Sequence, residues 1–485
     1  MKSVLTKAAA CSVVALLAAC SSSSGGSSSG TTAAPGTTAA PGTTAAAGTS
    51  AAPGTSAAPG TSAAPGTTSA APGTTSGGGS GGGNAVDSSL TAAQCGAPAS
   101  GGDGKPITVG IITSLTGVAS SSFSDVKTGV KAYFDALNAK GGVNGHKINY
   151  VVADDQSSPT SNLTAVKDLV ENKKVTAIGV WDSFLFGSVD YLLGKGMPLL
   201  GGSFDGPEWG VPKYSNMFGV VGVANPKYPA FSSFRDWFKS KGVTKVASLA
   251  YGPSPSSIGS AKGSAASAEQ AGAKVVYTNY NVPFGSTNFT ADAIAIKNSG
   301  ADAVIAPMVE ASDIALITAL KQAGANVKVP LLYTGYDPNT LNDPAAAAAF
   351  EGAYIVGTYP FYDGSNPAAT AQMANLKAAG YTKDIPTFGV GGGYTAAMAV
   401  ACGLQAAGAN PTQQSIIANT RKVTAFDGNG VFLEKTDFSK QFDGIGSFDG
   451  GSLCQNWVTV QSKQFVLDTK QPLCGSNIPG TETVK

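Results

Sequence analysis

The sequence ITVGIITSLTG at residues 107–117, followed by GVKAYFDALNAKGGVNGHKINYVVADD at residues 129–155, carries the pattern that decides the fold. Residues 107–112 form an apolar run typical of a buried strand, and a polar loop follows at residues 113–124. Apolar side chains then recur at helical spacing, at Val126, Val130, Tyr133, Phe134 and Leu137. Residues 147–153 form a second apolar run, so this stretch predicts a strand–helix–strand unit.

The same alternation continues on both sides of the Asn225-Pro226 pair. We expect further strands at residues 175–180, 197–200, 245–250, 273–280, 303–307, 330–333 and 353–358. An Ala-rich helix is predicted at residues 261–272, a long helix at residues 394–407 after a run of three glycines, and a hairpin at residues 453–460 and 465–467. Strands that alternate with helices at this pitch predict an α/β protein with mainly parallel sheets flanked by helices. Two such series joined by chain crossings predict two lobes with a cleft between them, at the carboxyl ends of the strands.

The N-terminal residues predict export. Lys2 and Lys7 precede an apolar stretch at residues 8–19, which is shorter than a membrane-spanning helix and fits a signal peptide. Leu17-Ala18-Ala19-Cys20 resembles a bacterial lipobox, so we expect cleavage after residue 19 and lipidation of Cys20, which would anchor the protein to the membrane. The alternative is an ordinary signal peptide followed by an incidental cysteine.

Residues 20–95 are dominated by Ser, Thr, Ala, Pro and Gly, with repeats close to GTTAAPG. Such a segment buries too little apolar surface to offset the entropy of ordering, so we expect a disordered tether. A flexible chain of this length has a mean reach of roughly 45–50 Å.

The remaining composition excludes several classes of function. Only 13% of the residues are charged and the formal net charge is +1, so nothing predicts binding to nucleic acid or to an anionic membrane surface. The one histidine, His146, lies in the turn Asn144-Gly145-His146-Lys147, where we expect a solvated side chain. A nucleophilic serine or cysteine therefore has no evident base, and we expect a protein that is not an enzyme and uses no metal or cofactor.

Four cysteines remain after Cys11 leaves with the signal peptide and Cys20 is lipidated. In an exported protein they predict two disulfides, with three possible pairings. The predicted hairpin brings Cys454 near Cys474, so we favour Cys454–Cys474 and Cys95–Cys402. Free buried thiols are the alternative.

From residue 105 to about residue 467 the chain resembles the Leu/Ile/Val-binding family of extracytoplasmic solute-binding proteins. The resemblance rests on the stretches quoted above, on the turn NAKGGVNG at residues 138–145 and on Asp154-Asp155 with the loop that follows. It implies the type I periplasmic-binding fold, with one lobe at residues 105–224 and 357–445, a second lobe at residues 225–356 and 446–478, and a hinge between them. It also implies a monomeric receptor that closes on an amino acid or related metabolite and delivers it to an ABC permease in the membrane.

The resemblance further implies a ligand site made from strand-end loops of both lobes. Its candidate residues are Ser122, Phe123, Trp181, Ser183, Phe204, Asp205, Tyr251, Glu310, Tyr336 and Asp337. Ser183 matches a ligand-contacting serine of the family, and Asp205 would accept a hydrogen bond from an ammonium or hydroxyl group. Four of the candidates have a structural alternative: Ser183 and Asp205 as caps, and Phe123 and Trp181 as core packing.

Two loops depart from the family pattern. The sequence WDSFLF at residues 181–186 stands where amino-acid binders carry a Ser/Thr-rich loop, and GGSFDG at residues 201–206 replaces a loop with alanine and threonine. The aromatic residues predict a more apolar pocket, so aromatic acids, amides, peptides and other small metabolites remain open beside amino acids. A sensory lipoprotein that signals through a membrane partner, without transport, is the alternative function.

Overall fold

The computed structural model describes residues 93–220, 227–442, 453–470 and 472–483. All of these belong to Gly81–Lys485, one of the two compact units into which the chain divides. The predicted signal peptide, the lipidated Cys20 and residues 20–92 of the predicted tether lie outside the described residues. The last three residues of that predicted tether, Ala93–Cys95, form the short 3-10 helix η1, in which Cys95 is buried.

A five-stranded parallel sheet forms the centre of the first lobe. Its strands stand in the order β2-β1-β3-β4-β5 and every neighbouring pair is parallel. The strands are β1 (Ile107–Thr113), β2 (Ile148–Asp154), β3 (Ile178–Val180), β4 (Leu199–Gly202) and β5 (Met217–Val220). The near-continuous burial of β1, β3, β4 and β5 is what a sheet covered on both faces requires.

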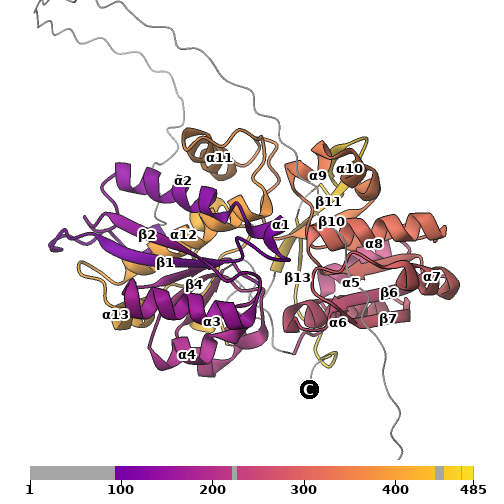
Figure 1. Ribbon diagram of the computed structural model, residues 1–485, viewed down its shortest axis with the longest axis horizontal. Coiled ribbons are helices and arrows are strands. Elements are labelled where there is room, and N and C mark those ends of the chain that lie inside the picture. Colours follow the sequence, from indigo (N-terminus) through magenta and orange to yellow (C-terminus); the bar gives the residue numbers. More distant parts are fainter. Residues whose placement is uncertain (1–92, 221–226, 443–452, 471, 484–485) are drawn as a thin grey trace, which may run out of the picture. The chain divides into compact units, whose positions relative to one another are not determined.

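Helices cover both faces of this sheet (Figure 1). One face packs through Val109 and Ile111 against α2 (Val126–Ala139) and α12 (Phe388–Ala406). The other face packs against α3 (Pro159–Lys167) and α4 (Val189–Gly194). The first lobe also contains α1 (Ser120–Phe123), the π-helix η2 (Asp168–Asn172), α11 (Pro367–Ala378) and α13 (Gln413–Thr420).

Glycines allow α2 and α12 to pack closely. A Cβ at Gly129 would lie 1.9 Å from the carbonyl oxygen of Val390, and one at Gly393 would lie 2.0 Å from that of Val126. The prediction that α12 begins at residue 394 is therefore wrong, because the three glycines lie inside the helix, where they provide contact surface.

An eight-stranded sheet forms the centre of the second lobe. Its main order is β12-β11-β10-β9-β8-β6-β7, with β13 paired to β11. The strands are β6 (Lys245–Tyr251), β7 (Lys274–Val282), β8 (Ala303–Ala306), β9 (Val329–Leu332), β10 (Tyr354–Gly357), β11 (Leu453–Gln461), β12 (Gln464–Leu467) and β13 (Leu473–Gly475). β6 to β10 are parallel, and β11 runs antiparallel to its neighbours β10, β12 and β13.

This second sheet is also covered on both faces (Figure 1). One face packs against α5 (Ser232–Ser240) and α6 (Pro255–Gln270). The other face packs against α7 (Thr290–Ser299), α8 (Glu310–Ala323) and α10 (Pro344–Phe350). The short helix α9 (Pro338–Asn342) lies between α8 and α10 in the sequence. The predicted fold class, α/β with two mainly parallel sheets flanked by helices, is confirmed.

Two disulfides join distant parts of the chain in the pairing favoured from the sequence. Cys95 is bonded to Cys402 of α12, with the two Cα atoms 5.3 Å apart. Cys454 is bonded to Cys474 across the antiparallel pair β11 and β13. The first bond fixes the residues before β1 to a helix that lies about three hundred positions further along the chain.

The expectation of a solvated His146 is wrong. Its side chain is 2% exposed, and its ring nitrogens lie 2.7 Å from the carbonyl oxygen of Lys105 and 2.6 Å from that of Ala409. The hydrogen bond to Ala409 is the main reason that the pKa of His146 is raised. This histidine therefore ties the turn before β2 to the residues after α12, away from the site described below.

None of the described helices is both long and apolar enough to span a bilayer.

Candidate functional site

A cavity of about 220 Å³ is lined by residues of both lobes, and we call it the main cavity. It lies at the carboxyl ends of the strands, because Trp181 follows β3, Phe204 follows β4 and Tyr251 ends β6. The first lobe contributes Ser122, Phe123, Trp181, Ser183, Phe204 and Phe388. The other lining residues are Tyr251, Ser254, Ser256, Ser257, Ser260, Phe284, Pro307, Met308, Val309, Tyr333, Thr334, Val356, Gly357, Thr358, Tyr359 and Gln455.

Four aromatic side chains of the first lobe form one wall, which we call the aromatic cluster: Phe123, Trp181, Phe204 and Phe388. The indole of Trp181 lies 4.9 Å from the ring of Phe204 and 5.2 Å from that of Phe388, centroid to centroid. Phe123 and Phe388 meet edge to face at 5.5 Å. Such contacts hold the rings in fixed orientations, so this wall is a preformed apolar surface.

Two glycines make room for the indole of Trp181. A Cβ at Gly392 would lie 1.9 Å from it, and a Cβ at Gly202 would lie 2.7 Å from it. The Gly-rich start of α12 therefore positions a cavity residue as well as packing against α2.

The second lobe contributes a stacked pair, Tyr251 and Phe284, with ring centroids 4.3 Å apart. The hydroxyl of Tyr251 donates to Ser312 Oγ at 2.6 Å and accepts from the backbone N–H of Val309 at 3.2 Å. Its polar atom is thus engaged inside the lobe. Phe284 also lies 4.8 Å from Phe184, so an aromatic contact joins the two lobes beside the main cavity.

A different kind of wall stands at the start of α6. Ser254 caps the helix by accepting from the N–H of Ser257, and Pro255 occupies the first turn. Ser254, Ser256, Ser257 and Ser260 all line the main cavity. The serine-rich N-terminus of a helix, with its partial positive charge, thus lines the same cavity as the aromatic cluster.

Three buried polar atoms on the wall have no hydrogen-bond partner within the described residues: Ser122 Oγ, Trp181 Nε1 and Gln455 Oε1. Their residues are 4%, 6% and 8% exposed. Leaving a buried polar group unpaired is unfavourable, so such atoms in a cavity wall are typical of a site that a ligand completes.

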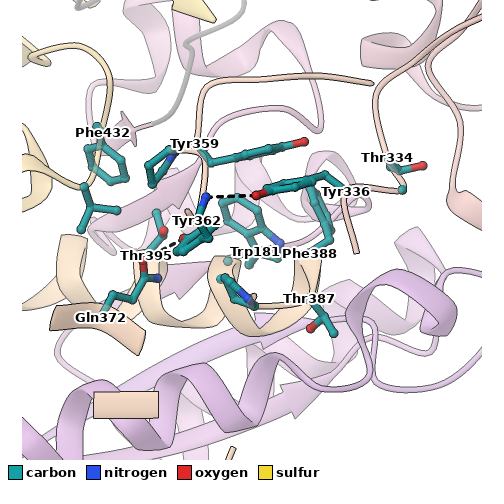
Figure 2. A pocket seen from close by; sticks show the side chains of 16 residues that line it. Trp181, Thr334, Tyr336, Tyr359, Tyr362, Gln372, Thr387, Phe388, Thr395 and Phe432 are labelled. Atoms are coloured by element: carbon teal, nitrogen blue, oxygen red, sulfur yellow. Dashed lines mark hydrogen bonds between the residues drawn. The ribbon is translucent and has the colours of Figure 1, made fainter. Parts of the chain in front are cut away.

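Trp181 also lines a smaller cavity of about 50 Å³, which we call the side cavity (Figure 2). Its rings include Tyr336, which follows β9, and Tyr359 and Tyr362, which follow β10. The hydroxyl of Tyr336 accepts from the backbone N–H of Tyr362 at 3.0 Å, and the hydroxyl of Tyr362 donates to Gln372 at 2.9 Å. Tyr336, a candidate from the sequence, therefore lies in the side cavity rather than the main one.

Among the candidates, Ser122, Phe123, Trp181, Ser183, Phe204 and Tyr251 all line the main cavity. The three acidic candidates line neither cavity. Asp205 is 1% exposed and accepts from the indole N–H of Trp209 at 2.5 Å. Burial, and then the neighbouring Glu208, raise the pKa of Asp205 to about 8.

Glu310 and Asp337 are engaged within the protein as well. Glu310 accepts from the hydroxyl of Thr340, and burial, followed by the nearby Asp337, raises its pKa to about 7. Asp337 caps α9 by accepting from the N–H of Asn339 at 2.7 Å and also accepts from the N–H of Phe388 at 3.3 Å. Burial is the main cause that raises the pKa of Asp337. Its contact with Phe388 joins α9 to the start of α12.

No Asp, Glu, Lys, Arg or His is among the described residues that line the main or the side cavity. A possible metal cluster within the described part of the chain is Glu434 with Cys454 and Cys474. Both cysteines are disulfide-bonded, so they offer no thiolate to an ion.

Several lining residues were missed from the sequence, notably the serines at the start of α6, Phe284, Phe388 and Gln455. The helix predicted at residues 261–272 in fact begins at Pro255. Ser254-Pro255 directly after a strand is a capping residue followed by a proline of the first turn, and this signal would have found the serine wall. Phe388 was missed because the glycines that follow it at residues 391–393 have low helix propensity, so the helix was predicted to begin after them.

Comparisons with known proteins agree with this geometry. A model of the family described as periplasmic binding protein matches residues 106–448. The Leu/Ile/Val-binding protein homolog 3 of Brucella melitensis is 22% identical over 355 residues, 72% of this chain and 92% of that relative. The resemblance to the Leu/Ile/Val-binding family is thereby confirmed.

Solved structures show the same fold. The branched-chain amino acid transporter substrate binding protein LivJ of Streptococcus pneumoniae, solved with isoleucine, superposes with a TM-score of 0.62 at 18% identity, covering 77% of this chain and 99% of LivJ. An ABC transporter solute binding protein of R. palustris, in complex with benzoate, has a TM-score of 0.62 at 16% identity. The match covers 78% of this chain and 99% of the R. palustris chain. The family model spans well over half of the sequence, and the chain therefore belongs to the periplasmic binding protein family.

Proposed function

We propose that this protein is an extracytoplasmic receptor that closes its two lobes on a small molecule, an amino acid or related metabolite, and delivers it to an ABC importer. The family consists of solute-binding proteins rather than enzymes. The observation that carries the proposal is the main cavity, whose wall is made by strand-end residues of both lobes. A solute bound there touches both lobes and thereby favours their closed arrangement.

The lobes that would move are residues 105–224 with 357–445 and residues 225–356 with 446–478. Each contains its own sheet and its own buried clusters, so each is expected to move as a rigid body about the chain crossings between them. The closed form, as a monomer, is the species that a permease would recognise.

We further propose that the receptor is held at the membrane through lipidated Cys20. The segment at residues 20–92, with a mean reach of roughly 45–50 Å if it is a flexible chain, would let the lobes turn toward the permease while staying near it.

The test is a thermal-shift screen of the full chain against amino acids and small organic acids and amides. A solute present at one hundred times its Kd stabilises a protein by about 2.7 kcal/mol, which raises the melting temperature by several degrees. Phe204→Ala, in the cavity wall, should abolish the shift. Phe186→Ala is the matched control, because Phe186 is also half-buried in the first lobe but lies outside the cavity lining.

Deletion of the gene should also abolish the uptake of a solute found in this way by the cell. A stabilising solute whose effect survives Phe204→Ala unchanged, or a broad panel with no stabilising solute, would contradict the proposal.

A further inference from the structure

The wall of the main cavity is uncharged. Among the described lining residues there is neither a carboxylate nor a cationic side chain. A solute carrying an ammonium group would have to bury that charge without an opposite charge beside it, which is strongly unfavourable. The cavity therefore selects against amino acids as such.

Three carboxyl groups were candidates for an ammonium partner. Asp205 accepts from Trp209 through Oδ1, while its Oδ2 is buried without a partner among the described residues. Glu310 accepts from Thr340, and Asp337 accepts from two backbone N–H groups. None of these carboxyl groups reaches the cavity wall.

The start of α6 favours a single negative charge. The helix has 16 residues, and Ser254, Ser256 and Ser257 at its start line the cavity. The hydroxyl of Ser257 already donates to the carbonyl of Pro307, so the hydroxyls available to a solute are those of Ser254 and Ser256. A helix N-terminus with nearby hydroxyl donors stabilises an anion without a cationic side chain. Because this partial charge is roughly half an elementary charge, it suits one carboxylate rather than two.

An independent observation also indicates a ligand. Ser122, on the first lobe, is only 4% exposed, and its buried hydroxyl oxygen Oγ has no hydrogen-bond partner in the described residues. It can donate to an acceptor atom of a solute. Gln455 Oε1 lacks a partner too and can accept from a hydroxyl on the same solute.

The aromatic cluster determines which kind of solute body the main cavity favours. Phe123, Trp181, Phe204 and Phe388 present a continuous apolar surface, with neighbouring ring centroids 4.9 to 6.3 Å apart. A flat ring stacks on such a surface or meets it edge to face.

We propose that the main cavity takes a monocarboxylate with an aromatic or similarly apolar body and without an amino group, a refinement that rests on the function proposed above. The carboxylate lies at the first turn of α6, and the apolar body lies against the aromatic cluster.

Calorimetric titration of the full chain tests this with three probes of nearly equal size: phenylacetate, L-phenylalanine and phenylacetamide. Phenylacetate should bind, phenylalanine should bind at least about 100-fold more weakly because its ammonium is unpaired, and phenylacetamide at least about 10-fold more weakly because it carries no charge. Leucine and isoleucine complete the panel.

A matched pair of variants tests the position of the carboxylate. Ser256→Asp places a like charge in the first turn of α6, where an acidic residue suits the helix, and should weaken phenylacetate about 10- to 100-fold. It should leave phenylacetamide within about threefold. Ser256→Asn is the uncharged control of similar size and should keep the affinity for phenylacetate.

The outcomes separate this inference from the function on which it rests. Binding of phenylalanine, leucine or isoleucine as tight as that of phenylacetate overturns the inference and leaves the receptor function standing. Equal binding of phenylacetamide and phenylacetate, or an equal loss of both in Ser256→Asp, overturns the place of the carboxylate. Failure of every probe and of the wider solute panel contradicts the receptor function itself.

Discussion

Asp205 is a carboxyl group held in apolar surroundings, and its protonation is linked to the stability of the first lobe. Burial raises its pKa to about 8. In the unfolded chain an aspartate titrates near 3.9. The folded protein thus holds a proton that the unfolded chain releases throughout this pH interval.

The sign of the pH effect follows from this raised pKa. The contribution of Asp205 to stability is fully present below about pH 4, declines as the pH rises from about 4 to about 8, and is constant above that. Asp205→Asn keeps an oxygen that accepts from Trp209 but has no proton to lose. The free energy of unfolding of the native protein should therefore fall relative to that of the variant by up to ~1.4 kcal/mol per pH unit in this interval. Denaturant unfolding of both proteins at pH 5, 6, 7 and 8 measures the difference, and parallel curves would contradict it.

At this scale the sequence predicted the apolar and hydroxyl contacts better than the acidic ones. Trp181 and Phe204 lie in the loops that follow β3 and β4, and the resemblance to the Leu/Ile/Val-binding family indicated that such loops form the ligand site. The hydrogen-bond partner of Asp205 is Trp209, four positions further along the chain. It could not be predicted, because no periodicity in the sequence defines the path of the turn between them. His146 was misplaced for the same reason, since the carbonyl of Ala409 that it contacts lies 263 positions away.

At the scale of elements, the first turns of α12 connect the core of the first lobe to the cavity. Gly393 faces α2, Gly392 faces the indole of Trp181, and Gly391 has only Pro386 near it, at 3.7 Å from an added Cβ. Three adjacent glycines therefore differ sharply in what a methyl group would meet.

These glycines give a matched pair of substitutions. Gly392→Ala forces the indole of Trp181 aside and should lower the free energy of unfolding by ~1–3 kcal/mol while weakening the binding of any solute. Gly391→Ala should leave binding unchanged and stabilise the protein by up to ~1 kcal/mol, because alanine has the higher helix propensity. Denaturant unfolding and calorimetric titration measure both effects. Equal affinities in the two variants would contradict the role given to Gly392.

Most strands could be predicted because their buried apolar runs are long. β1 and β6 begin at the residues expected, and the hairpin of β11 and β12 lies where it was placed. The short β5 (Met217–Val220) was missed, because four residues give little periodicity. Helix starts were the weakest part, since α6 and α12 open with serines, proline and glycines whose contribution comes from capping and close contact.

At the scale of the whole molecule, the two mainly parallel sheets and the pairing of the four described cysteines agree with what the sequence predicted. The sequence predicted an apolar pocket with aromatic residues at the strand ends, but it wrongly included three acidic residues in the lining. That its wall is uncharged depends on where three carboxyl groups turn after their strands. Asp205 and Glu310 turn toward partners in their own lobes, and Asp337 accepts from Asn339 and from Phe388 of the other lobe.

Hydrogen–deuterium exchange of the full chain, with and without a stabilising solute, shows whether one small solute is held between the two lobes. We expect slower exchange at residues 181–186 and 202–206 of the first lobe together with residues 254–260 of the second, since these segments form opposite walls of the main cavity. Slower exchange in only one lobe, or at segments away from the cavity, would contradict binding between the lobes.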